Sequence, residues 1–155
     1  MSTVRLSKGF TILELLIVIA VFGLLATLAV LSLNSARARM RDAKRVSDVS
    51  IMRAALSQHW LEKATYPQSA GVNLGQAGTN TDVFTGSGFV SRELAQPPIY
   101  VQQVPLGPKS SEYYRYKANA NGYSIRFQTE TDTVLGEPNV YYAHAVGIDN
   151  EDTEK

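Results

Sequence analysis

An uninterrupted apolar segment near the N-terminus constrains this chain more than any other feature. It runs from Phe10 to Leu33, 24 residues that contain one charged side chain, Glu14. As a helix with a rise of about 1.5 Å per residue, such a segment crosses the roughly 30 Å hydrocarbon layer of a bilayer. A secretory signal peptide has a shorter apolar region, of about 7–15 residues, followed by a small-residue cleavage site. Basic residues follow here instead, so the pattern predicts a membrane-spanning helix.

Glu14 is the anomaly of this segment, because it places a carboxylate in a helix that faces lipid. A charged residue in a membrane helix costs about 2.5–3.5 kcal/mol on insertion scales, so such residues are functional hypotheses by default. The helix offers Glu14 no positive side chain within reach. A new α-amino group, created by cutting the chain near Phe10, would supply a partner, either within one chain or from a neighbouring copy. A charge that is neutralised by assembly favours an oligomer.

The residues around Glu14 resemble the class III signal of type IV pilins and type II secretion pseudopilins. From Lys8 they read KGFTILELL. This matches a basic residue, a glycine, a Phe-Thr pair, two apolar residues and a glutamate that open a long apolar helix. The specific likeness extends from Lys8 to the aromatic-proline pair Tyr66-Pro67, and beyond that pair it concerns the general layout only.

This resemblance implies a maturation step and an assembly step. A prepilin peptidase would cut after Gly9 and N-methylate Phe10, which makes residues 1–9 a leader peptide. Glu14 would pair with the N-terminus of an adjacent subunit, so the implied partners are copies of this chain, other pilins and an inner-membrane assembly platform. The implied fold is α+β and pilin-like. A transmembrane and assembly helix covers residues 10–33, and a globular domain over residues 34–155 packs the second half of the helix on a small antiparallel sheet.

The charges on either side of the apolar segment disagree with this resemblance about topology. Five basic residues follow the segment, whereas only Arg5 and Lys8 precede it. The positive-inside rule alone places the C-terminal domain in the cytoplasm. The resemblance implies the opposite: a single pass of the cytoplasmic membrane with the leader inside, the domain outside, and an extracellular or periplasmic filament. The five residues are expected on a solvated or headgroup-level surface, or else paired with acidic groups of neighbouring subunits. They are Arg37, Arg39, Arg41, Lys44 and Arg45.

Beyond the apolar segment the hydrophobic residues follow a helical period. A stripe recurs at intervals of three or four residues, and it consists of Val49, Met52, Leu56 and Trp60. One helix is therefore expected from Thr11 to Ala64. Tyr66-Pro67 would end it, because proline cannot continue the hydrogen-bond ladder. Trp60 is expected in the core and His59 on the helix surface.

The remaining chain alternates between turn-rich and strand-like segments. Residues 68–111 are polar and rich in glycine and proline, so they are expected to form a long connection that holds short elements, including a helical turn near residues 88–94. Period-two alternation then predicts strands over residues 113–118, 123–128 and 140–146. Most of the tyrosines fall here, and they are expected to pack across neighbouring strands.

Some features depart from particular subgroups of the family. Major pseudopilins carry a calcium loop near the C-terminus and tend to show a Pro-x-Asp-Pro motif, whereas residues 104–108 read VPLGP. Neither calcium nor membership of that subgroup is therefore carried over. The acidic tail, residues 149–155, lacks the spacing of a known calcium loop and is expected to be frayed and solvated. The chain has no cysteine, which excludes disulfides, thiolate zinc sites and cysteine nucleophiles.

These features predict a structural subunit of a type IV pilus-like filament, with a minor or competence pilin and a type II secretion pseudopilin as alternatives. A membrane-anchored binding module that never polymerises is a second class, and it predicts no cut at Gly9. An enzyme is disfavoured, because His59 and His144 are far apart and no phosphate loop, hydrolase elbow or metal spacing appears. No catalytic residue, metal or cofactor is assigned. With 15 basic and 14 acidic residues there is no global basic field, and nucleic-acid binding stays open.

Processing supplies a direct test. Mass spectrometry of the mature protein is expected to find a chain that begins at Phe10 with a methyl group on its nitrogen. Removal of the leader takes away Arg5 and Lys8 and no acidic residue, so the formal net charge falls from +1 to −1. Replacing Gly9 by valine is expected to leave the precursor in the membrane. Efficient maturation of Gly9→Val would contradict the cleavage site.

Overall fold

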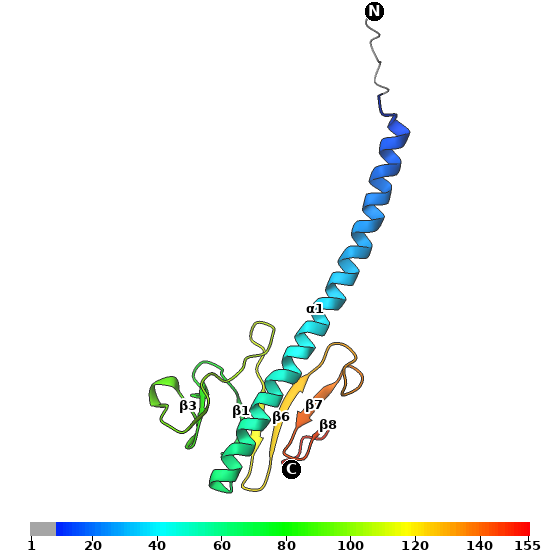
Figure 1. The fold of residues 1–155 in the computed structure, drawn as a ribbon. Coiled ribbons are helices and arrows are strands. Elements are labelled where there is room, and N and C mark those ends of the chain that lie inside the picture. Colours follow the sequence, from blue (N-terminus) through cyan, green and yellow to red (C-terminus); the bar gives the residue numbers. More distant parts are fainter. Residues whose placement is uncertain (1–8) are drawn as a thin grey trace, which may run out of the picture. The chain divides into compact units, whose positions relative to one another are not determined.

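The long helix predicted from the sequence is present. A computed structural model describes residues 9–155, so the expected leader lies outside the described residues except for Gly9. The chain divides into an N-terminal unit of residues 1–37 and a globular unit of residues 38–155. One helix, α1 (Ile12–Lys63), contributes to both units (Figure 1). Each end lies within one residue of the predicted boundary, and Ala64 leaves the helix with a left-handed φ of 53°.

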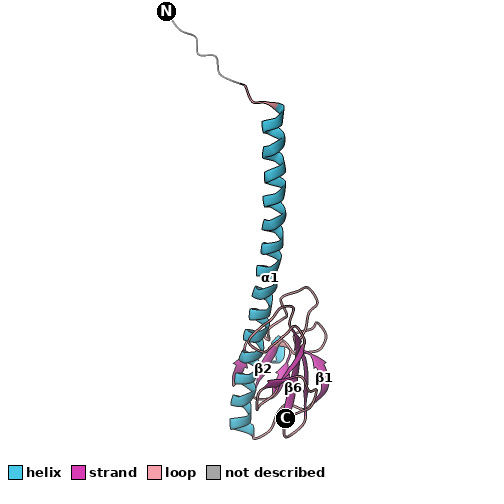
Figure 2. Cartoon of the chain, turned by 90° about the vertical axis from the view of Figure 1, so that its right-hand side faces the viewer, coloured by secondary structure: helices cyan, strands magenta, loops and turns pink. Residues whose placement is uncertain are grey.

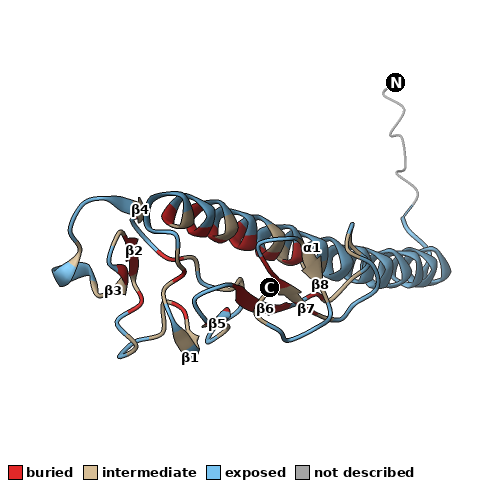
Figure 3. Ribbon diagram, turned by 90° about the horizontal axis from the view of Figure 1, so that it is seen from below, coloured by how far each residue is buried: buried red, intermediate tan, exposed pale blue. Residues whose placement is uncertain are grey.

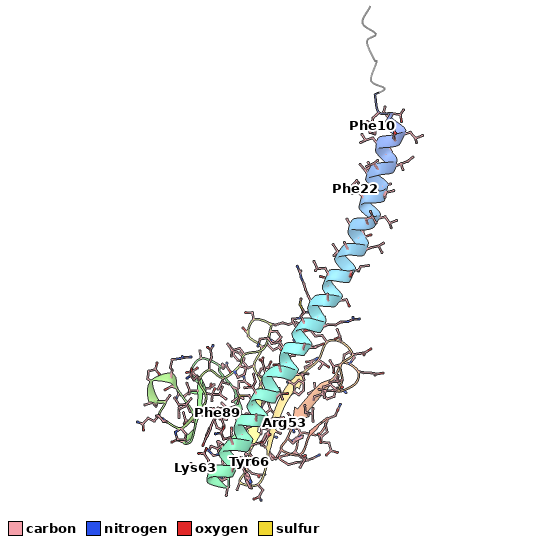
Figure 4. The ribbon with its side chains drawn as sticks, viewed as in Figure 1. Phe10, Phe22, Arg53, Lys63, Tyr66 and Phe89 are labelled. Carbon is pink, nitrogen blue, oxygen red and sulfur yellow. The ribbon has the colours of Figure 1, made fainter. Side chains whose placement is uncertain are left out.

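The described part of the N-terminal unit consists of residues 9–11 and the apolar first half of α1. Its large side chains, among them Phe10 and Phe22, project outward and are exposed (Figure 4). By length and composition α1 contains a stretch that is able to cross a membrane. A helix is the structure that such a segment needs, because it satisfies nearly every backbone N–H and C=O group internally where no water is present to do so.

The globular unit contains a five-stranded antiparallel sheet in the order β1-β5-β6-β7-β8. Figure 2 shows strands of the globular unit, β1 and β6 among them, beside the second half of α1. Its strands are β1 (Ser69–Asn73), β5 (Arg115–Ala118), β6 (Tyr123–Gln128), β7 (Val140–Ala143) and β8 (Ile148–Asp149). The predicted strand at 123–128 matches β6, and the predictions at 113–118 and 140–146 contain β5 and β7. The sequence reading missed β1 and β8, which close the two edges of the sheet.

The long polar connection holds a second, three-stranded antiparallel sheet in the order β3-β2-β4. Its strands are β2 (Val83–Thr85), β3 (Gly88–Val90) and β4 (Ile99–Val101), and the short helix η1 (Arg92–Leu94) lies between β3 and β4. The helical turn expected near residues 88–94 is therefore half correct, because its first three residues form a strand and its last three form η1.

The core lies where α1 meets the sheets, and the predicted stripe is confirmed. Val49, Met52 and Leu56 are fully buried, and so are Tyr116 and Tyr123 on the facing strands. Figure 3 shows the buried helix residues along the side of α1 that faces the strands. The tyrosines therefore pack as the strand pattern predicts.

Trp60 completes this stripe at its last turn, although its ring is only partly buried. The indole stacks on Tyr66, with 4.7 Å between the ring centroids. Tyr66 in turn meets Tyr123 of β6 edge to face at 4.9 Å. Trp60 thus closes the core at the C-terminal end of α1 and does not sit at its centre.

His59 is buried, so its predicted place on the helix surface is wrong. Its imidazole stacks on Phe84 of β2 at 5.5 Å, and its Nδ1 atom lies 2.9 Å from the carbonyl oxygen of Thr65. The small sheet covers this side of α1, which makes the buried face of the helix wider than the apolar stripe alone indicates.

Two charged helix residues, Asp42 and Arg45, are also buried, which corrects the expected solvated surface for Arg45. Their side chains are 2% and 3% exposed and are joined by a 2.7 Å ion pair. The Arg45 guanidinium also meets Glu112 at 2.6 Å and Glu130 at 2.7 Å. One guanidinium therefore forms ion pairs with three carboxylates, one from α1 and two from loops of the globular unit.

The same cluster fastens the β6–β7 loop to α1. The Asp42 carboxylate accepts hydrogen bonds from the backbone N–H groups of Glu130 and Thr131 and from the Thr131 hydroxyl, at 2.7–3.0 Å. Burial opposes ionisation of Asp42, but these hydrogen bonds outweigh it and lower its pKa. Hydrogen bonds from Arg41, and then from Lys109 and Arg45, lower the pKa of Glu130. Both carboxylates are thus held in their charged form.

The C-terminal tail is bonded to the sheet, so the prediction of a frayed tail is wrong. Asp152 accepts a 3.1 Å hydrogen bond from Ser124 of β6 and lies 3.3 Å from Lys117 of β5. The Lys155 ammonium meets Asp149 at 2.9 Å. The backbone N–H of Glu151, together with Lys155, lowers the pKa of Asp149 to about 2. Composition alone indicates a solvated segment. In the structure, lysine, serine and backbone N–H groups instead bind the carboxylates of the acidic tail.

The core analysis predicts opposite outcomes for two leucines on α1. Leu56→Ala removes a fully buried side chain and is expected to lower the free energy of unfolding of the globular unit by about 2–5 kcal/mol. Leu61→Ala, at a side chain that is 84% exposed, is expected to stay within about 0.5 kcal/mol of the parent. Urea titration of the mature chain in detergent micelles, followed by circular dichroism, measures both. Equal losses from the two variants would contradict the assigned helix face.

Candidate processing and assembly site

The predicted cleavage site lies immediately before α1. Gly9 and Phe10 precede the helix, and the Phe10 side chain is 84% exposed. A Cβ atom added at Gly9 would meet no other heavy atom within 4 Å. The fold itself therefore leaves room for a larger residue at position 9.

Thr11 and Glu14 form a reciprocal cap at the start of α1. The Glu14 backbone N–H donates to the Thr11 hydroxyl oxygen at 3.2 Å, and the Thr11 backbone N–H donates to Glu14 Oε2 at 3.4 Å. The first N–H groups of a helix have no partner within the helix, and this capping box satisfies two of them. In a helix that enters lipid, each such group left without a partner costs several kcal/mol.

The cap gives the Glu14 carboxylate a defined place. Its charge lies in the first turn, where the helix dipole favours an anion. Oε1 has no hydrogen-bond partner within residues 9–155, and no ion pair reaches this carboxylate within the same span. The next charged side chain along the helix is Arg37, about six turns further on.

Of the predicted site residues, the structure brings Glu14 next to Thr11 and places Gly9 and Phe10 just outside the helix. Thr11 is the residue that sequence reasoning missed. A local signal was present, because T-x-x-E before an apolar run is the pattern of a capping box. The sequence analysis places the helix start at Thr11 but assigns the Thr11 side chain no capping role.

Groups suited to other chemistry do not gather elsewhere in the described chain. Among residues 9–155, no three His, Cys, Asp or Glu side chains are placed to hold a metal ion. His144 is fully buried, with Nδ1 2.9 Å from the Tyr123 carbonyl oxygen and Nε2 3.1 Å from Asp149. Both of its ring nitrogens thus serve the fold.

Comparison with known proteins gives matches at both the motif and the chain level. A family model described as a prokaryotic N-terminal methylation motif matches residues 4–30. The type II secretion system core protein G of Escherichia coli K12 is 37% identical over 125 residues, which cover 74% of this chain and 75% of that protein. The core protein G of Pectobacterium carotovorum is 36% identical over 136 residues, which cover 83% and 79%.

A fimbrial protein of Pseudomonas aeruginosa is 36% identical over 66 residues, which cover 43% of each chain. A search of the solved structures finds no significant match to the chain. These relatives are named as parts of a secretion system and of fimbriae.

The capping box predicts a specific effect of Thr11. Thr11→Ala removes the hydroxyl that accepts the Glu14 N–H, and loss of an N-cap residue costs about 0.5–2 kcal/mol. Exchange of the Glu14 amide hydrogen is expected to accelerate by roughly 2-fold to 30-fold in the mature chain in detergent micelles, measured by NMR. Thr11→Ser keeps the oxygen and is expected to exchange like the parent. Unchanged exchange in Thr11→Ala would show that the cap does not form.

Proposed function

Since this chain belongs to the family of pilin-like proteins that includes the type II secretion system core protein G, we propose that it is a structural subunit of a pilus-like filament. The observation that carries the proposal is the start of α1. An apolar helix begins there, its first turn contains Glu14 in a capping box with Thr11, and a Gly-Phe pair precedes that box. The proposal assigns no catalytic step to this chain.

Maturation is the first step of the proposal. A prepilin peptidase cuts after Gly9 and methylates the nitrogen of Phe10, so residues 1–9 are a leader. The open surroundings of Gly9 support this role, because they leave the cleavage site accessible to another protein. Residues 10–33 then form the membrane and assembly helix, and residues 34–155 form the globular domain with the second half of α1.

Assembly is the second step, and Glu14 directs it. Oε2 accepts the Thr11 N–H of the same chain, whereas Oε1 has no hydrogen-bond partner within residues 9–155 and is left for a group of another subunit. The new α-amino group of Phe10 in an adjacent copy is a cation of the right size and charge. In lipid such an ion pair is strong, because the low dielectric constant weakens the attraction little. Pairing thus offsets the cost of burying Glu14 and sets the register between subunits.

The exposed side of α1 in the globular unit supports close contact between copies. Every exposed residue of α1 from Ser47 to Leu61 is uncharged. Two of the serines donate back to carbonyl oxygens one turn earlier, Ser50 at 2.7 Å and Ser57 at 2.9 Å. Small residues on an uncharged helix surface, such as these serines and Ala54, allow neighbouring helices to approach closely.

The leader is placed in the cytoplasm and the globular domain outside, since the peptidase acts on a cytoplasmic leader. Arg41, Lys44 and Arg45, which argue for the opposite topology, pair with acidic groups of their own chain. These ion pairs form in the folded globular unit, so they give the basic residues a structural role that does not depend on topology. The partners are copies of this chain, related pilins and an assembly platform in the inner membrane.

Among the filament types, we favour a type II secretion pseudopilin. The core protein G relatives match over three quarters or more of their own length, whereas the fimbrial match covers 43%. The missing aspartate in residues 104–108 remains a departure from the major pseudopilin pattern. The share of this chain in sheared filaments separates a major from a minor subunit.

Two substitutions of Glu14 test the assembly step. Glu14→Ala removes the partner of the α-amino group, and filament yield is expected to fall at least tenfold, since a lost ion pair in lipid exceeds about 1.4 kcal/mol. Glu14→Gln keeps the shape and the cap acceptor but not the charge, so an equal fall identifies ion pairing. The measurement is the amount of this chain in sheared filaments relative to total membrane protein.

The control is Glu93→Gln, which removes an exposed charge in η1 and is expected to leave the yield unchanged. All variants are expected to insert and to keep the circular dichroism spectrum of the parent. Normal filament yield from both Glu14 variants would overturn the pairing mechanism. Loss of the protein from the membrane would assign Glu14 to insertion or stability.

A further inference from the structure

The solvent face of the five-stranded sheet carries two arginines directly opposite each other. Arg115 of β5 pairs in register with Arg126 of β6, and both side chains are exposed. Like charges at directly opposed positions of an antiparallel pair destabilise a sheet. A neutral residue at either position would remove that repulsion. The pair therefore does not serve the stability of the sheet, and a role in binding accounts for it better.

Neither arginine has an acidic partner within residues 9–155, although other basic side chains around it do. On the same face of β5, Lys117 meets Asp152 at 3.3 Å and Glu154 at 3.7 Å. Lys109, which lines the same hollow as Arg126, meets Glu130 at 2.8 Å. The chain thus supplies carboxylates to the neighbouring cations and leaves Arg115 and Arg126 unmatched.

The guanidinium of Arg115 lies beside Gly71 of β1. Gly71 has a φ of 132°, and a Cβ atom added there would lie 2.9 Å from Arg115 Nη2 and 3.0 Å from its Nε. The register between β1 and β5 shifts between Ser69 and Val72, on either side of this glycine. A side chain at position 71 would therefore crowd the guanidinium, and glycine leaves Arg115 room beside β1.

Arg126 borders a polar hollow of about 350 Å³. Hydrogen-bonding side chains that line it include those of Ser110, Ser111, Tyr113 and Gln128. The acidic groups in its wall, Glu112 and Glu130, already bind Arg45. The groups that remain for a ligand are therefore a guanidinium, three hydroxyls and an amide, which together favour an anion with several acceptor oxygens.

We propose that this arginine face, formed by Arg115, Arg126 and the adjoining hollow, is a docking surface for an acidic segment of a partner protein. Closely spaced carboxylates of such a segment match two guanidinium groups on neighbouring strands. The surroundings disfavour a long polyanion such as nucleic acid. Asp149 lies in the same row of the sheet beyond Tyr142, the tail carries Asp152 and Glu154, and the mature chain has a formal net charge of −1.

The test uses the mature full chain in micelles of a nonionic detergent and a fluorescent peptide with four glutamates. Fluorescence anisotropy at low salt is expected to show saturable binding, and a matched peptide with four glutamines is expected to bind at least tenfold more weakly. Arg115→Gln and Arg126→Gln are each expected to weaken binding of the acidic peptide by roughly threefold to tenfold. Arg115→Lys keeps the charge but not the planar fork, and is expected to lose part of the affinity.

The matched control is Arg92→Gln, which removes an arginine of η1 outside the arginine face. It is expected to bind the acidic peptide like the parent, while circular dichroism shows that all variants fold. Equal binding of the two peptides, or an equal loss in Arg92→Gln, would overturn the proposal. Tighter binding of a single-stranded DNA oligomer of the same charge would also overturn the proposal. So would the finding that Arg126 mediates self-association of the chain and does not mediate binding of the acidic peptide. Filament assembly takes no part in the assay, so its result is independent of the proposed function.

Discussion

A backbone that enters lipid must satisfy its own hydrogen bonds, and the rest of this structure depends on that requirement. It makes the apolar segment a helix, and it makes the first turn the weak point, because the first N–H groups have no partner within the helix. Thr11 and Glu14 form a reciprocal cap that supplies acceptors for two of these N–H groups. The same helix then continues without a break to Lys63, where it becomes one layer of the globular core. Assembly and folding are therefore built on a single element.

The features that local sequence determines were predicted closely. The ends of α1 follow from Thr11 and from Tyr66-Pro67, and the strand at 123–128 follows from strict alternation beside a tight turn. The buried stripe of α1 follows from its period. At the candidate site, Gly9, Phe10 and Glu14 came from the motif, and their roles in cleavage, methylation and pairing remain proposals.

The features that failed depend on residues far away along the chain. Nothing near Arg45 indicates that Glu112 and Glu130 lie beside it, and nothing near His59 indicates that β2 covers it. A helical period identifies an apolar stripe, but it does not show how wide a face the remaining chain will cover. The acidic tail was misjudged for the same reason, since Ser124 and Lys117 lie more than 25 residues before the carboxylate that they bind. Thr11 is different, because its signal was local and was interpreted as part of another motif.

The buried cluster around Arg45 also bears on how this chain can change over generations. One guanidinium neutralises carboxylates on α1, on the loop before β5 and on the loop after β6, and removal of either member of a buried pair leaves a charge that costs about 3–5 kcal/mol. That cost is a large share of the stability of a small domain. We therefore expect selection to remove single substitutions at these positions, so that replacement of the cluster requires several changes at once. We expect these four positions to be inherited as a set.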